Sequence, residues 1–229
     1  MTPDWRPSPN FGARKGGAVP ELIVLHYTAM ESCDAACRTL CNPENEVSAH
    51  YLIGPDGHVI QMVEESQRAW HAGAGTWQGR GDVNSRSIGI EMSNTGFAPF
   101  AAPLFNSLEV LLRQIMTRWD IAASGIIAHS DFAPGRKIDP GKRFDWQRLA
   151  RQGLAVWPRA LEAAAPDMAR FRAAAVSFGY PVDAEPEVLL ASFRLRFNPT
   201  ASGALCARDV ALAEALAREF GIDQAGAGA

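Results

Sequence analysis

Short apolar runs that end at a polar residue form the most regular pattern in this chain. Residues 21–28 and 125–129 each contain such a run, with the length and branched side chains typical of a buried strand. Residues 87–92 alternate instead, which places two isoleucines on one face of a strand and Glu91 on the other. We therefore predict three strands, and in two of them the apolar run ends at a histidine.

A hairpin and a set of helices complete the predicted secondary structure. Residues 48–53 and 58–63 flank Gly54-Pro-Asp-Gly57, a sequence typical of a tight turn between paired strands. Residues 1–20 and 68–86 are rich in glycine or proline and are expected to form an irregular arm and a loop. Apolar stripes and terminating residues predict helices over residues 31–41, 104–119, 144–161, 167–178, 185–196 and 207–219.

The order of these elements predicts the fold class and two domains. Strands mixed with helices, with one hairpin among them, predict an α/β domain over residues 1–160, in which helices flank a mixed central β-sheet. The last three helices predict a small C-terminal three-helix domain over residues 166–222. Residues 163–166 are the expected junction between the two.

Composition narrows the classes of function. The chain has 229 residues and a formal net charge of −3 with both signs dispersed, so it lacks the basic stripe of a nucleic-acid-binding protein. No stretch is long and apolar enough to span a bilayer, and residues 1–12 contain no apolar signal core. We expect a cytoplasmic monomer that binds neither nucleic acid nor membrane, with the periplasm as the alternative compartment.

Three of the four cysteines recur at every fourth position, at Cys33, Cys37 and Cys41, and would share one helix face. A metal or redox cluster is one interpretation of this spacing. Small buried apolar groups are the other. We favour the second, because zinc-binding cysteines usually come in closer pairs with further ligands downstream.

Two histidines and one aspartate stand where predicted strands give way to polar loops. His26 and His129 end the two apolar runs, and Asp139 follows ten residues after His129 in an Asp-Pro-Gly turn. Such strand exits are where α/β proteins usually build their sites. A lone histidine there is more often a packed or hydrogen-bonding residue. Two imidazoles and a carboxylate that converge, however, can hold a zinc ion with one position open, as catalytic zinc sites require.

Five short motifs occur in order around these residues. They are His26-Tyr-Thr28, Val47-Ser-Ala-His-Tyr-Leu52, Ala69-Trp-His-Ala-Gly73, Ser87-Ile-Gly-Ile-Glu91 and the segment from Ala128 to Gly141. The ordered set closely resembles the zinc-dependent N-acetylmuramoyl-L-alanine amidases of the type-2 amidase family. That family is related to T7 lysozyme and to the peptidoglycan recognition proteins. The resemblance covers roughly residues 8–158.

The resemblance implies roles for five residues. His26, His129 and Asp139 match the family's ligands for one zinc ion, Glu91 matches its catalytic glutamate, and Lys137 matches its catalytic lysine. In these roles Glu91 takes a proton from the attacking water and passes it to the leaving amine. Lys137 stabilises the oxyanion that forms at the lactyl carbonyl of N-acetylmuramic acid.

Candidate substrate contacts come from the neighbouring segments. The glycine-rich loop with Trp70, His71 and Arg80 is expected to form a wall of the cleft, where an arginine suits a stem-peptide carboxylate. Tyr27 and His50, from the first two motifs, complete the set. For the tryptophans of the loop, packing is an equally open alternative, and His50 also fits a core histidine.

The expected function is hydrolysis of the amide bond between N-acetylmuramic acid, or its 1,6-anhydro form, and L-alanine of the stem peptide, in cell-wall turnover or recycling. A peptidoglycan recognition module that binds without cutting is the alternative, and a zinc peptidase acting on another amide is the third possibility. The presence of all three ligands with Glu91 and Lys137 favours the amidase. The substrate can be a soluble muropeptide or intact wall.

The C-terminal segment weakly resembles the small helical peptidoglycan-binding domain attached to such amidases. The matching features are residues 177–182, 189–197 and 201–204. Residues 183–187 lack the glycines normally found there. This segment is therefore expected either to bind peptidoglycan or only to pack against the catalytic domain.

Overall fold

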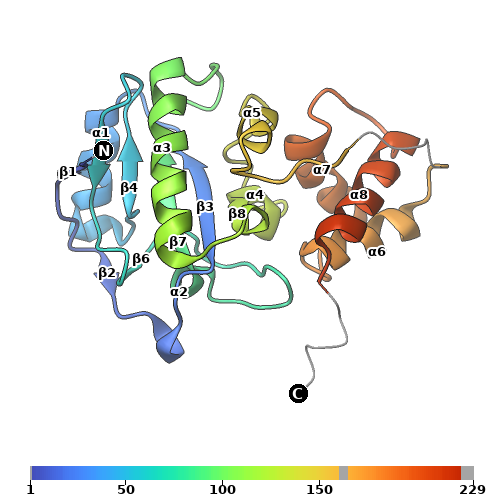
Figure 1. Ribbon diagram of the computed structural model, residues 1–229, viewed down its shortest axis with the longest axis horizontal. Coiled ribbons are helices and arrows are strands. Elements are labelled where there is room, and N and C mark those ends of the chain that lie inside the picture. Colours follow the sequence, from blue (N-terminus) through green and yellow to red (C-terminus); the bar gives the residue numbers. More distant parts are fainter. Residues whose placement is uncertain (1, 160–164, 223–229) are drawn as a thin grey trace.

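Two groups of elements lie side by side in the computed structural model, which describes residues 2–159 and 165–222. One is a sheet with helices on both faces, and the other consists of the three C-terminal helices (Figure 1). This arrangement confirms the predicted α/β class with a mixed central sheet. Of the expected junction at residues 163–166, residues 163 and 164 lie outside the described residues.

The central sheet has six strands in the order β1-β5-β4-β7-β3-β8. β7 (Ser87–Met92), β3 (Leu22–Tyr27) and β8 (Ile126–Ala128) are parallel, and β4 (Tyr51–Ile53) is parallel to β7. β5 (Val59–Gln61) returns antiparallel to β4, as the predicted hairpin requires. The apolar runs therefore identified the strands correctly, although the hairpin strands are shorter than predicted.

The N-terminal arm is more regular than its sequence indicates. β1 (Asp4–Trp5) adds to the sheet beside β5, and β2 (Phe11–Gly12) pairs with β6 (Arg68–Ala69) from the predicted loop. Arg14 holds the arm further, because its guanidinium donates to the backbone carbonyl of Glu65 at 2.7 Å. Strands of two residues are too short to show an alternating pattern, and the prediction of an irregular arm was wrong for this reason.

The predicted helices form with one exception, and the structure adds two short helices that were not predicted, at Val83–Arg86 in the expected loop and at His129–Phe132. The helix expected over residues 144–161 ends at Arg151, where Gly153 adopts a positive φ of 71° and Pro158 follows. The α-helices are α1 (Cys33–Cys41), α2 (Val83–Arg86), α3 (Ala102–Trp119), α4 (His129–Phe132), α5 (Trp146–Arg151), α6 (Met168–Phe178), α7 (Pro186–Phe197) and α8 (Ala207–Phe220), with short 3₁₀ turns at Lys15–Gly17, Pro43–Asn45 and Ala123–Gly125.

The two faces of the sheet are covered differently. On one face, α3 and α5 pack against residues such as Leu25 in a continuous apolar cluster. On the other face, α1 covers Leu52 at one end, and the C-terminal helices cover Val24 at the other. The carboxyl ends of β3 and β7 lie between these two covers and carry His26 and Glu91 there. This uncovered stretch of sheet is where the site forms.

The cysteines of α1 pack against the sheet face that contains Leu52. Cys37 is buried with Leu40 and Leu52, and Cys33 and Cys41 pack against the same cluster. Burial raises the pKa of Cys33 and of Cys41 to about 11, which keeps both thiols protonated at neutral pH. These features support the interpretation of the cysteines as small packed groups.

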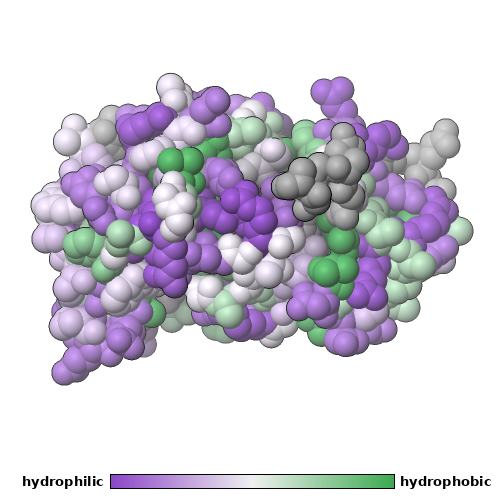
Figure 2. All heavy atoms as spheres, turned by 90° about the horizontal axis from the view of Figure 1, so that it is seen from below, coloured by the Kyte–Doolittle hydropathy of each residue, from purple (hydrophilic) through white to green (hydrophobic). Residues whose placement is uncertain are grey.

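The molecular surface is mainly polar on the face drawn in Figure 2, with apolar side chains in small, separate patches. Exposed large apolar residues such as Val19, Phe97 and Val182 are far apart in the sequence. Within residues 2–159 and 165–222, no helix has both the length and the apolar character that crossing a bilayer requires.

Candidate active site

The structure brings the three predicted metal ligands together. His26 lies near the end of β3, His129 opens α4 directly after the neighbouring parallel strand β8, and Asp139 lies in the loop that follows. Nδ1 of His26 is 2.9 Å from Nδ1 of His129, and Oδ2 of Asp139 is 2.9 Å and 3.1 Å from these two atoms. All three residues are buried.

The tautomer of His26 is set by a chain of hydrogen bonds that ends at a backbone carbonyl. The hydroxyl of Ser87 donates its proton to the carbonyl of Val83 at 2.5 Å. The same hydroxyl oxygen can therefore only accept from Nε2 of His71, which lies 3.2 Å away. Burial and the neighbouring His26 lower the pKa of His71, which keeps it neutral. Its Nδ1 then accepts the Nε2–H of His26 at 3.0 Å. The free nitrogen of His26 is therefore Nδ1, the atom that faces Asp139.

His129 reaches the same state through a different partner. Its Nε2 lies 2.9 Å from the carbonyl oxygen of Ala72, which can only accept. Burial lowers the pKa of His129 to about 4, so the ring is neutral and Nδ1 carries a lone pair. Two imidazole lone pairs and a carboxylate oxygen thus face one another, an arrangement that a bound cation stabilises. Because this donor set is typical of zinc, and both second nitrogens are oriented by partners, the residues fit a zinc ion.

Gly89 leaves the space that allows the ring of His71 to lie between Ser87 and His26. A methyl group at Gly89 would overlap the imidazole of His71, so the ring lies directly against the backbone of β7. Any side chain at this position would push His71 away from His26. The glycine of the fourth sequence motif is therefore required for the contact between His71 and His26.

Glu91 is placed to act on a group bound at this site. It is the register partner of His26 on the adjacent parallel strand, so both side chains project from the same face. Its Oε2 atom is buried and has no hydrogen-bond partner within the described part of the chain. Burial raises the pKa of Glu91 to about 7, although His26 and Lys137 act in the opposite direction. A carboxylate in this state is suited to general-base catalysis near neutral pH.

A cavity of about 510 Å³ opens over these residues. The three predicted metal ligands, Glu91 and Lys137 all line it. Tyr27, Trp70 and His71 line it as well, so three of the five predicted substrate contacts lie at the cavity.

His50 and Arg80 lie elsewhere. His50 is fully buried, its Nδ1 accepts from the backbone N–H of Gly89 at 3.0 Å, and its Nε2 donates to the carbonyl of Gln67 at 3.1 Å. Burial lowers the pKa of His50 to about 3. Arg80 donates to the carboxylate of Glu21 at 2.8 Å. Because their polar groups are used within the protein, we do not retain either residue as a substrate contact.

Arg136 lines the same cavity and was missed by the sequence analysis. Its guanidinium donates to the carbonyl of Ala72 at 2.7 Å and to that of Ala74, which fastens the glycine-rich loop to the loop that carries Asp139. Its place beside Lys137 in the last motif was an available signal.

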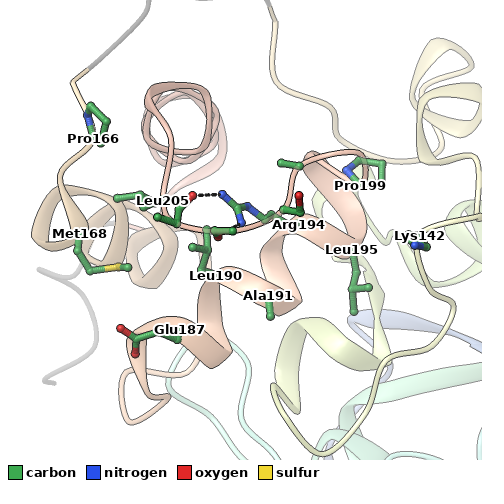
Figure 3. A pocket seen from close by; sticks show the side chains of 14 residues that line it. Lys142, Pro166, Met168, Glu187, Leu190, Ala191, Arg194, Leu195, Pro199 and Leu205 are labelled. Atoms are coloured by element: carbon green, nitrogen blue, oxygen red, sulfur yellow. Dashed lines mark hydrogen bonds between the residues drawn. The ribbon is translucent and has the colours of Figure 1, made fainter.

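A second hollow, of about 800 Å³, lies over the C-terminal helices (Figure 3). It is lined by Lys142, Glu187 and Arg194 among mostly apolar residues. Arg194 is turned toward the loop before α8, where it donates to the carbonyls of Gly203 and Ala204. The described residues around this hollow include no histidine or cysteine, so the hydrolytic chemistry belongs to the first cavity.

The fold and the site together define a class: α/β proteins that gather two histidines, an aspartate and a glutamate at the carboxyl ends of parallel strands, a set suited to amide hydrolysis. The chain belongs to the N-acetylmuramoyl-L-alanine amidase family, whose family model matches residues 16–142.

Individual relatives agree with this assignment. The chain is 35% identical over 237 residues to the N-acetylmuramoyl-L-alanine amidase AmiD of Escherichia coli, covering 89% of this chain and 84% of that protein. It is 33% identical over 160 residues to the 1,6-anhydro-N-acetylmuramyl-L-alanine amidase AmpD of Citrobacter freundii, covering 62% of this chain and 86% of that protein. At 89% coverage the first similarity extends into the C-terminal helices, and the second covers about as many residues as the predicted catalytic domain.

Two solved structures are also similar over nearly the whole chain. The complex of E. coli AmiD with the substrate anhydro-N-acetylmuramic acid-L-Ala-D-γ-Glu-L-Lys has a TM-score of 0.83 and 32% identity, covering 93% of this chain and 99% of that chain. AmpDh3 from Pseudomonas aeruginosa in complex with an anhydromuramic pentapeptide has a TM-score of 0.77 and 28% identity, covering 95% and 96% of the two chains.

Proposed function

We propose that this chain is a zinc-dependent amidase that hydrolyses the bond between 1,6-anhydro-N-acetylmuramic acid and L-alanine of the stem peptide. The observation that carries the proposal is the convergence of His26, His129 and Asp139 in one cavity with Glu91, whose Oε2 has no hydrogen-bond partner among the described residues. The similarity to AmiD in complex with an anhydro-muropeptide supports this substrate class.

The chain's residues divide the chemistry among themselves. One zinc ion, held by Nδ1 of His26 and His129 and by Asp139, would supply a Lewis acid that activates water and polarises the scissile carbonyl. Glu91 takes the proton of the attacking water and delivers it to the leaving amine. Lys137 offers an ammonium in the same cavity to the negative charge that develops on the carbonyl oxygen.

The remaining lining residues bind the substrate. Tyr27 and Trp70 present aromatic surface to the sugar or the peptide, while His71 orients His26 from below. In this proposal residues 1–160 form the catalytic domain and residues 166–222 a peptidoglycan-binding-like domain. The thiols packed on α1 suit a reducing compartment, so we place the enzyme in the cytoplasm, with cell fractionation as the test.

The decisive experiment incubates zinc-loaded protein with anhydro-muropeptide and identifies the products by mass spectrometry. Release of free stem peptide by the unaltered protein, lost in Glu91→Ala and kept in Glu64→Ala, is the expected result, since Glu64 is an exposed carboxylate outside this cavity. Binding without release in all three proteins would instead identify a recognition module, and cleavage at another amide would identify a peptidase. Parallel reactions with intact sacculi decide between fragment and wall as substrate.

A further inference from the structure

The C-terminal helices share a hydrophobic core with the sheet face that carries the site. Val24 of β3 and Ile127 of β8 belong to the same buried cluster as Phe171, Phe193 and Leu216 from the three helices. These helices therefore pack directly beneath the two strands that lead to His26 and His129, as their position next to α4 and β8 indicates (Figure 1).

A buried ion pair crosses from these helices to α4. Arg196 of α7 and Asp131 of α4 are both fully buried, with 2.5 Å between Nη1 and Oδ2. The other carboxylate oxygen of Asp131 accepts from the hydroxyl of Tyr180 at 2.7 Å. Arg196 also donates to the carbonyl of Ile126 at 3.2 Å, so one guanidinium holds both the strand before His129 and the helix that His129 opens.

Asp131 links these contacts to His129, the proposed metal ligand. Its Oδ2 accepts from the backbone N–H of Ala128 at 2.9 Å, which closes the first turn of α4 around His129. The position of the His129 backbone thus depends on the direction of the Asp131 side chain, and that direction is set by Arg196 and Tyr180 from the C-terminal segment.

The C-terminal segment also contacts the loop that carries Ala72, the hydrogen-bond partner of His129 Nε2. Trp77 of the glycine-rich loop is fully buried against Phe178 and Tyr180, and a methyl group at Gly179 would lie 2.8 Å from its indole. The same loop carries Ala72, whose carbonyl orients Nε2 of His129. The C-terminal segment therefore holds both the helix and the loop that orient this imidazole.

We propose that the C-terminal helices act as a brace for the metal site, in which Arg196 and Tyr180 are positioning residues for His129 through Asp131. This inference rests on the proposed zinc site. Burying two charges removes most of the gain from their attraction, so stability alone is a weak reason to keep such a pair. Positioning of a ligand gives the pair a specific purpose, because partners that orient metal ligands change metal affinity.

The chain contains a matched control. Arg194, two residues before Arg196 on α7, pairs with the fully buried carboxylate of Asp209 on α8 at 2.6 Å. This pair stays within the C-terminal helices, whereas the Arg196 pair leaves them. Replacing either arginine by methionine removes a charge from a buried pair, but only Arg196→Met releases α4.

The test measures the zinc dissociation constant by competition with a chromophoric chelator, alongside thermal unfolding and the kcat and KM for anhydro-muropeptide. We expect zinc to bind about 10-fold more weakly to Arg196→Met and within twofold of wild type to Arg194→Met, although both lose thermal stability. Tyr180→Phe keeps the packed ring and removes one hydrogen bond to Asp131, so we expect a loss of about threefold. At limiting zinc, kcat should fall in Arg196→Met while KM stays close to wild type.

Each result for zinc affinity either supports or overturns the brace. Equal zinc affinity in Arg196→Met and wild type, or an equal loss in Arg194→Met, overturns the brace and leaves the zinc site standing. If Arg196→Met does not fold, Tyr180→Phe decides in its place, with unchanged affinity counting against the brace. Wild-type protein that binds no zinc would overturn the proposed site first, and the brace with it.

Discussion

Two carboxylates on opposite sides of the sheet, the buried Glu65 and the partly buried Glu91, have opposite surroundings. Glu65 accepts hydrogen bonds from the hydroxyl of Tyr51 at 2.7 Å, from Arg118 at 2.6 Å and from the indole of Trp119 at 2.6 Å. Glu91 has one buried oxygen without any such partner in the described ranges, 2–159 and 165–222.

Their protonation follows from these surroundings. Burial acts to raise the pKa of both side chains, but the donors around Glu65 outweigh it and hold the pKa of that carboxyl below its ordinary value. Within the described residues no donor reaches the buried Oε2 of Glu91, and burial raises the pKa of this carboxyl to about 7. A buried carboxylate with all its partners crosslinks the fold, whereas a carboxylate with an unpaired oxygen beside the proposed metal ligands is available for proton transfer.

The comparison is tested most strongly by removing each charge in turn. Glu91→Gln should lower kcat by about 10²- to 10⁴-fold, because the proton acceptor is lost while the shape is kept. Glu65→Gln should leave kcat within about twofold of wild type, since this residue lies on the far side of the sheet. Steady-state assays with zinc content measured for each protein check both values, and comparable losses in the two variants would remove the distinction.

The pH dependence of unfolding separates the same residues in metal-free protein. The pKa of Glu91 is about 4.5 in the unfolded state and is raised by burial to about 7 in the folded state. As the pH increases between these two values, Glu91 ionises more readily in the unfolded state, so the folded state is destabilised. Glu91→Gln should therefore stabilise the metal-free protein at pH 8 by up to about 3 kcal/mol and have little effect at pH 4. Urea unfolding in the presence of a chelator measures the difference, and a pH-independent effect would contradict the shifted pKa.

Glu65 should behave in the opposite sense. Its folded pKa is lowered, so its contribution to stability is present above the unfolded pKa and is lost as pH falls through the folded one. We expect Glu65→Gln to destabilise the protein by about 1–3 kcal/mol at pH 7 and by less in acid. The same urea titrations provide the measurement, and a loss that grows toward low pH would count against the paired carboxylate.

The contrast extends to serines next to the site. Ser87→Ala breaks the hydrogen-bond chain that fixes the tautomer of His26 through His71, so zinc affinity should fall by about threefold to 10-fold. Ser85→Ala is the matched control, because Ser85 accepts from the backbone N–H of Lys15 and takes no part in the hydrogen-bond series from Ser87 to His26. Chelator competition on both variants tests this, and equal affinities would mean that the tautomer is fixed without Ser87.

The features that could be predicted from the sequence are those encoded locally. A buried strand needs a short apolar run, and a strand that ends at a site needs a polar residue there, so β3, β8 and the histidines at their ends followed from neighbouring residues alone. The proposed zinc ligands and Glu91 also lie in motifs whose order is distinctive. The resemblance to a known family then supplied roles that spacing by itself left open.

The features that escaped prediction depend on distant partners. Arg196 and Asp131 are separated by 65 positions, and neither has a sequence context that marks it as buried. His50 is a polar residue whose burial is possible only because the backbone of Gly89 and the carbonyl of Gln67 satisfy both nitrogens. Arg80 was predicted as a cleft residue because the loop is rich in glycine, but its partner Glu21 comes from another part of the chain.

The packing of Trp77 against residues 178–180 affects the order in which the protein can fold during synthesis. Synthesis proceeds from the N-terminus, and the early part of a chain can begin to fold before the rest has left the ribosome. Here the indole of Trp77 and the carboxylate of Asp131 must wait for partners from residues 178–196. A nascent chain that ends before residue 178 leaves Trp77 and Asp131 without these partners. The packing around both side chains is therefore completed late in translation.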